Sequence, residues 1–206
     1  MRPVPPNVRI LAGIPVLWLA GFLVQVLVGA APARGWRVNR ALDAEAEGRA
    51  AEAAVVLGNL ADEHPDSAAL WIRAGHAAVA AGRPLEGAER LQHAAKLDPD
   101  SIKARYEWIK ALMACGLDDE SEPVLQELLE LKADHGDGLF LGAALAAGRG
   151  DAGLATTRLA AALEARCSSP ERWRVETRFD RVRADAAFQR VARDMRYAAE
   201  LRAVRP

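Results

Sequence analysis

Residues 68–101 read AALWIRAGHAAVAAGRPLEGAERLQHAAKLDPDS, a stretch that predicts two short helices joined by a turn at Gly82. Apolar residues recur at helical spacing on both sides of that glycine, and Pro99 ends the second helix because proline cannot continue one. Gly82 is also one of four glycines that follow each other at intervals of 34 residues: Gly48, Gly82, Gly116 and Gly150. A fixed period of this length predicts a helical repeat array.

The glycine period divides much of the chain into four frames of equal length: 34–67, 68–101, 102–135 and 136–169. Each frame has an apolar helical pattern, a glycine turn and a second apolar helical pattern. One helix pair alone would leave part of its apolar stripe exposed, so neighbouring pairs are expected to stack and complete the core. Alanine and leucine dominate, and runs of Val, Ile and Thr are nearly absent, which favours an all-helical protein.

The second frame resembles a tetratricopeptide repeat, because Trp71, Gly75, Gly82, Ala94 and Pro99 stand where that family has Trp, Gly, a turn Gly, Ala and Pro. The other frames keep the turn glycine and the apolar positions but less of the remaining pattern. The resemblance covers about residues 34–169 and implies a right-handed α-solenoid of about four helix-turn-helix repeats whose role is to bind other proteins.

The family binds partners along a concave groove that the first helix of each pair lines. Carried over residue by residue, the resemblance implies groove positions at Asn39, Arg73, His76, Lys103, Tyr106, Lys110 and Phe140. Arginine, lysine and tyrosine together suit an extended partner segment of acidic or carboxyl-terminal character. The carboxylate-gripping form of the family has Lys and Asn where this chain has Ile72 and His76, so the second frame departs from that form.

Residues 170–206 leave the 34-residue period and predict C-terminal capping helices. Phe179, Val182, Phe188 and Val191 can cover the last apolar face of the array, while the arginines between them stay in water.

The net charge of −1 conceals an asymmetry along the chain. Residues 41–157 hold 10 Lys and Arg against 21 Asp and Glu, a balance of −11, whereas residues 158–206 hold 12 Arg against 7 acidic residues, a balance of +5. We expect the basic cap to complement the acidic array. Anionic lipid or nucleic acid is the weaker alternative, because acidic residues interleave with the arginines, and nucleic acid is not an expected partner.

An uncharged run of 24 residues, 10–33, follows a short tail at 1–9 that carries Arg2 and Arg9. As a helix this run would extend about 36 Å, enough to cross a hydrocarbon core of about 30 Å. The sequence therefore predicts a single-pass transmembrane anchor. Flanking positive charges are nearly balanced, and the common export of chains that follow such anchors favours a repeat domain outside the cytoplasm.

A cleaved secretory signal is the alternative interpretation of the same run, because Ala31-Pro32-Ala33 has the A-x-A pattern of a cleavage site. The apolar core from Ile10 to Val28 is longer than the usual ~7–15 residues of a signal, which favours the uncleaved anchor.

No pattern of residues specifies a reaction. The sequence has no nucleophile elbow, phosphate loop or H-E-x-x-H pair, and Cys115 and Cys167 have neither a disulfide framework nor metal-ligand spacing with any histidine. The acidic run 118–122 is better explained as a helix start than as a metal loop. We therefore expect no enzyme activity, no cofactor and no metal.

These observations together predict a membrane-tethered protein–protein interaction scaffold that binds a partner segment in its groove. Two alternatives stay open: a secreted or periplasmic soluble module cleaved after Ala33, and a ligand-binding accessory subunit of an enzyme or transport complex.

Overall fold

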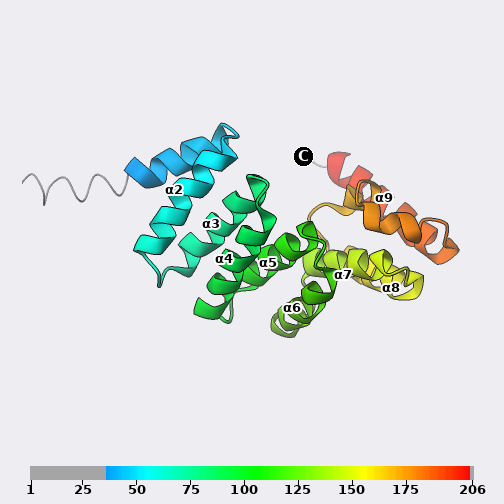
Figure 1. The fold of residues 1–206 in the computed structure, drawn as a ribbon. Coiled ribbons are helices and arrows are strands. Elements are labelled where there is room, and N and C mark those ends of the chain that lie inside the picture. The colour runs from blue at the N-terminus through cyan, green and yellow to red at the C-terminus, as the bar shows by residue number, and fades with distance from the viewer. Residues whose placement is uncertain (1–35, 205–206) are drawn as a thin grey trace, which may run out of the picture.

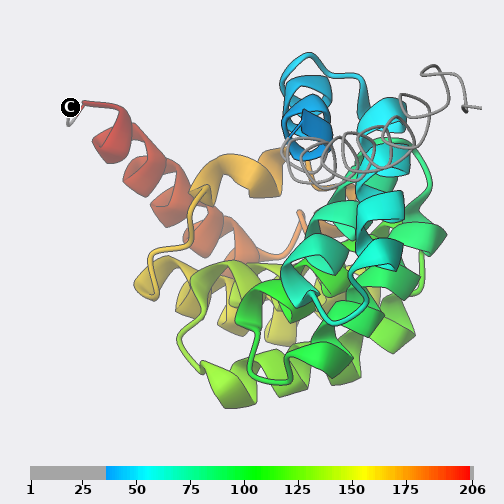
Figure 2. The same cartoon turned by 90° about the vertical axis from the view of Figure 1, so that its left-hand side faces the viewer.

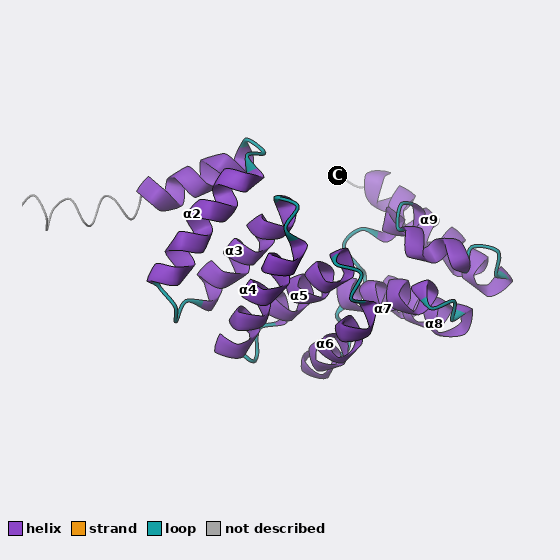
Figure 3. Ribbon diagram, viewed as in Figure 1, coloured by secondary structure: helices purple, strands orange, loops and turns teal. Residues whose placement is uncertain are grey.

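The computed structural model describes residues 36–204, and over that range the chain is helical without strands (Figure 3). A first helix over residues 36–46 pairs with α2 (Ala50–Glu63). Three further pairs follow in the same arrangement: α3 (Ala68–Ala80) with α4 (Pro84–Leu97), α5 (Ile102–Ala114) with α6 (Asp118–Leu131), and α7 (Gly136–Gly148) with α8 (Ala152–Glu164). The helices stand side by side in chain order (Figure 1), which confirms the predicted repeat solenoid.

The glycine period has a direct backbone cause. Gly48, Gly82, Gly116 and Gly150 all have positive φ, between +71° and +81°, a conformation that a side chain disfavours. At each turn the amide of the next residue reaches back to a carbonyl five residues earlier, as Arg83 N–H does to Ala78 O at 2.9 Å. Glycine at this position therefore ends the first helix of each pair and reverses the chain into the second.

Within a pair, the two helices meet at small residues. A Cβ atom on Gly75 would come within 2.5 Å of Leu91 Cγ and 3.0 Å of the Gly87 carbonyl oxygen, so α3 and α4 could not pack this closely with larger side chains there. The positions equivalent to Gly87 in the next two pairs are Ser121 and Ala155, and both are buried.

The C-terminal segment covers one end of the array. It consists of two short 3-10 helices, η2 (Pro170–Arg174) and η3 (Thr177–Arg181), followed by α9 (Ala186–Val204). Phe179, Val182 and Phe188 are buried, η3 packs against α7, and α9 packs against α8 and η2. Figure 2 shows α9 extending away from the array toward the C-terminus.

No helix within residues 36–204 is long and apolar enough to cross a membrane. The predicted anchor or signal at 10–33 lies outside the described residues, as does the tail at 1–9.

Candidate functional site

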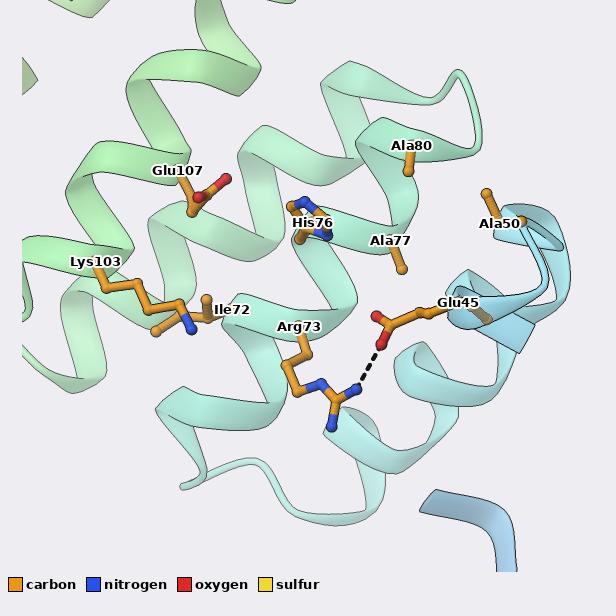
Figure 4. Close-up of a pocket in the computed structure, with 11 residues that line it drawn as sticks. Glu45, Ala50, Ile72, Arg73, His76, Ala77, Ala80, Lys103 and Glu107 are labelled. Carbon is orange, nitrogen blue, oxygen red and sulfur yellow. Dashed lines mark hydrogen bonds and ion pairs between the residues drawn. The ribbon is translucent and has the colours of Figure 1, made fainter. Parts of the chain in front are cut away.

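The open part of the inner surface is a groove of about 520 Å³ between the 36–46 helix, α3 and α5 (Figure 4). Its floor is apolar and consists largely of small side chains, among them Ala53 and Ala77, together with Ile72. The small floor follows from the repeat pattern, because buried alanines allow the helices of adjacent pairs to approach closely.

The walls of the groove carry charge. Arg73 donates a hydrogen bond to the Glu45 carboxylate at 2.6 Å, so a residue of the second repeat is tied to the first (Figure 4). His76 and Lys103 also line the groove, are exposed, and have no hydrogen-bond or ion-pair partner among the described residues. Glu107, the other acidic lining residue, is paired with Lys110 at 2.8 Å. The groove therefore presents an unpaired positive charge beside an apolar floor.

The inner surface of the last two repeats is filled by the chain itself. Arg172 of η2 places its guanidinium over the Phe140 ring, 4.7 Å from the centroid, and lies 3.5 Å from the Tyr106 hydroxyl. Arg178 of η3 donates to the Met113 carbonyl oxygen at 2.7 Å and makes a bidentate pair with Asp118. The hydrogen bonds that Arg178 donates to the Asp118 carboxylate raise the pKa of the guanidinium, so this contact holds a fixed positive charge.

This filling corrects part of the predicted groove. Phe140 is 1 % exposed, so the prediction that it contacts a partner is wrong: Phe179 packs against its ring at 5.7 Å and Arg172 covers it. Tyr106 is half-buried between His135 and Lys110, at centroid distances of 5.5 and 5.2 Å.

The other predicted positions divide into two groups. Arg73, His76 and Lys103 come together in the groove, and Lys110 lies beside it through its pair with Glu107. Asn39 is exposed on the 36–46 helix and is not one of the residues that line the groove. Sequence reasoning missed Glu45 and Glu107, whose carboxylates neutralise two of the expected cations.

The acidic run at 118–122 begins α6 and is engaged by arginines. Glu122 accepts hydrogen bonds from Arg158 at 2.6 Å and from Arg149 at 3.1 Å. Burial by itself raises the pKa of the Glu122 carboxyl, but the hydrogen bonds and charges of the arginines outweigh burial and lower it. Within residues 36–204, His, Cys, Asp and Glu side chains form no group of three that could hold a metal ion.

Neither Cys115 nor Cys167 takes part in a disulfide within the described residues. Cys167 is buried, and burial raises the pKa of the half-buried Cys115 thiol, with a smaller contribution from the charge of Glu120. A raised pKa leaves less thiolate at neutral pH and makes Cys115 a poor nucleophile.

Comparison with known proteins agrees with this architecture. A family model described as Tetratricopeptide repeat matches residues 78–145. A crystal structure of MamA protein is similar at 14% identity, with a TM-score of 0.63 over 81% of this chain and 93% of that chain. A thermophilic TPR protein of Thermus thermophilus, TTC0263, is similar at 13% identity, with a TM-score of 0.63 over 82% of this chain and 91% of that chain.

A third structure, YrrB, is described as a TPR protein with an unusual peptide-binding site and is 17% identical, with a TM-score of 0.56 over 81% of this chain and 89% of that one. No curated protein matches the sequence significantly. The family model thus identifies a tetratricopeptide repeat at residues 78–145, and the similarity to the solved structures shows the helical-repeat fold of the array.

Proposed function

We propose that this protein is a protein–protein interaction module that binds an extended, acidic segment of a partner in the groove between the 36–46 helix, α3 and α5. The observation that carries the proposal is the pair of exposed side chains His76 and Lys103, which have no partner within residues 36–204 and lie beside an apolar floor. A partner carboxylate next to Lys103 would gain a charge-assisted hydrogen bond, and small apolar side chains of the same segment would cover the alanines.

The last two repeats already hold a segment on their inner surface, namely the C-terminal segment of the chain, and this contact supports the proposal that the open groove holds a partner segment. There, the C-terminal segment lies against α7 and is anchored by two side chains: Arg172 contacts Tyr106 of α5, and Arg178 contacts Met113 of α5 and Asp118 at the start of α6. Asp137, which faces Arg172 at 3.9 Å, and Lys103 occupy equivalent positions in successive repeats, so the acidic side chain of the filled half is replaced by a basic one in the open groove. The open groove therefore suits a segment of opposite charge to the one that fills the other half.

The proposal includes a tether at the membrane through residues 10–33, for which the uncharged run in the sequence is the support. Binding without catalysis is also part of the proposal, since His76, the histidine that lines the groove, is paired with no carboxylate or thiol among the described residues.

A peptide library displayed on phage, selected on the full chain in a mild detergent, tests the groove. Selected peptides are expected to be acidic and to lose about tenfold or more in affinity to a His76→Glu, Lys103→Glu variant, which corresponds to about 1.4 kcal/mol. The matched control is Lys96→Glu, an exposed lysine of α4 that does not line the groove. Peptides that bind the groove variant as well as the original chain, or that lose equally to the control, would contradict the proposal.

A further inference from the structure

A second pocket of about 450 Å³ lies in the C-terminal cap, between η2 and α9, and shares no residue with the groove. Its lining includes two aromatic rings and three arginines: Trp173, Phe188, Arg183, Arg193 and Arg196. A pocket of this size accepts a large side chain or a small ligand.

The pocket combines an aromatic floor with a cationic rim. Phe188 is 1 % exposed and meets Trp173 edge to face, with ring centroids 6.1 Å apart. The Arg183 guanidinium lies over the Trp173 ring, 5.7 Å from its centroid. Arg193 and Arg196 are three residues apart on α9 and therefore share one face of the helix, on the same side as the lining residue Ala192.

Two of the three rim arginines have no acidic partner within the described structure. Three other arginines of the C-terminal part form the expected ion pairs with the acidic array. These pairs are Arg158–Glu122, Arg172–Asp137 and Arg178–Asp118. Arg183 is paired with Asp180, whereas Arg193 and Arg196 are exposed and have no acidic partner within residues 36–204. Ion pairing between the array and the cap thus accounts for several arginines of the cap but not for Arg193 and Arg196.

One polar group of a pocket residue also lacks a partner among the described residues. The indole N–H of Trp173 is buried and has no hydrogen-bond acceptor among the described residues. An unsatisfied buried donor is unfavourable, and Trp173, which carries this one, lines the pocket.

We infer that this pocket binds an acidic segment of a partner protein by taking up one aromatic side chain against the half-buried Trp173 ring while flanking carboxylates pair with Arg193 and Arg196. A concave, aromatic floor distinguishes the site from a membrane-binding surface. A flat anionic bilayer would attract all exposed arginines of α9 alike, including Arg190, which does not line the pocket. The inference is independent of the groove and of the proposed function.

The test uses a short fluorescein-labelled peptide of glutamates around a single phenylalanine, with the full chain in a mild detergent and anisotropy as the readout. We expect binding that weakens about tenfold or more in Arg193→Glu, Arg196→Glu and less than about twofold in Arg190→Glu, because only the first two arginines line the pocket. The same peptide with alanine in place of phenylalanine should also bind more weakly.

The inference would be overturned if the phenylalanine peptide did not bind, if replacing its phenylalanine had no effect, or if Arg190→Glu weakened binding as much as Arg193→Glu, Arg196→Glu does. It would also be overturned if His76→Glu, Lys103→Glu weakened binding and Arg193→Glu, Arg196→Glu did not. The last result places the peptide in the groove and leaves the proposed function intact. If phosphatidylcholine–phosphatidylserine vesicles bind, and the peptide does not, and if both arginine variants lose vesicle binding, the cap would be assigned to a membrane surface instead.

Discussion

The second and fourth repeats have the same turn geometry, yet the inner face of α3 is open while that of α7 lies under the C-terminal segment. Two repeats along the chain, Arg73 and His76 of α3 become Leu141 and Ala144 of α7, and both of these are buried. A helix that is apolar on every side must be covered on every side, whereas a helix with one polar face can leave that face in water. The comparison teaches that the side chains of the inner face, and not the repeat geometry, decide which half of the array is available to a partner.

The largest effect on this difference is expected from removing the buried ring that holds the C-terminal segment against α7. Phe179 is 0 % exposed and packs between Phe140 and Phe188, with ring centroids 5.7 and 5.4 Å away. We expect Phe179→Ala to lower the free energy of unfolding by about 3–5 kcal/mol, because it deletes a core ring and leaves a cavity. Urea denaturation measures the loss, and hydrogen exchange should show α7 amides losing protection first.

The matched control for that variant is Val175→Ala in the same segment, at a side chain that is 81 % exposed. Its stability should stay within about 0.5 kcal/mol of the original chain. A Phe179→Ala protein with unchanged α7 protection would show that the segment does not hold the filled half closed.

The turn glycines test whether the two halves are alike in backbone terms. Gly82 and Gly150 have φ of +76° and +81°, and a Cβ on either would meet nothing within 4 Å. Gly82→Val and Gly150→Val should therefore each cost about 1–3 kcal/mol from backbone strain alone. Thermal melting of the two variants should show similar decreases. A large effect at one turn and none at the other would mean that packing, and not φ, sets the cost.

The ion pair between Asp118 and Arg178 contributes less, because both side chains are partly in water, at 31 % and 22 % exposed. Asp118→Asn should cost about 1 kcal/mol and loosen η3 by hydrogen exchange, since a neutral amide cannot hold the guanidinium as strongly. Asp119→Asn, at a carboxylate that is 99 % exposed, is the control and should change neither quantity. Equal effects of the two variants would contradict the prediction that the Asp118–Arg178 pair stabilises η3.

The smallest effect concerns the pH dependence of the start of α7. The His135 ring nitrogen Nδ1 accepts a hydrogen bond from the Gly138 N–H at 2.9 Å, and burial lowers the pKa of the ring. The unfolded chain therefore takes up a proton more readily than the folded one, so this contribution to stability is complete above the ordinary pKa of about 6.5 and is lost as the pH falls below it.

His135→Asn keeps a capping oxygen but cannot titrate, so the decline in melting temperature from neutral to mildly acidic pH should become flatter than in the original chain. The control is His64→Asn, an exchange at a histidine outside the α7 cap, which should keep the original slope. Identical slopes in all three proteins would show that His135 does not contribute.

Much of the fold could be predicted from the sequence because the repeat makes local signals agree. Gly82 and Pro99 mark the ends of helices and Pro84 begins one. Each does so through its own allowed backbone angles, which need no distant contact. The groove was predicted less well. Arg73, His76 and Lys103 do meet, but Phe140 was assigned to the surface because the resemblance locates inner-face positions without indicating what covers them.

A signal for the covered half was present in GDGLFLGAALAAG at 136–148, which has almost no polar residue to face water. That pattern indicates a covered helix but does not say which segment covers it. The pairs that show it, Arg178 with Asp118 and Arg172 with Asp137, join residues 60 and 35 positions apart in the sequence.

By itself, the sequence determined the helical repeat, its turns and the apolar faces that must be buried, since helix ends and amphipathic stripes depend on residues only a few positions apart. It also determined the opposite charges of array and cap. The tertiary structure alone decided that the C-terminal segment fills the inner face of the last two repeats, that Arg73 is tied to Glu45, and that Arg193 and Arg196 have no acidic partner within residues 36–204. The physical reason is that burial and ion pairing depend on which distant segments share a surface, and the order of residues along the chain does not specify that arrangement.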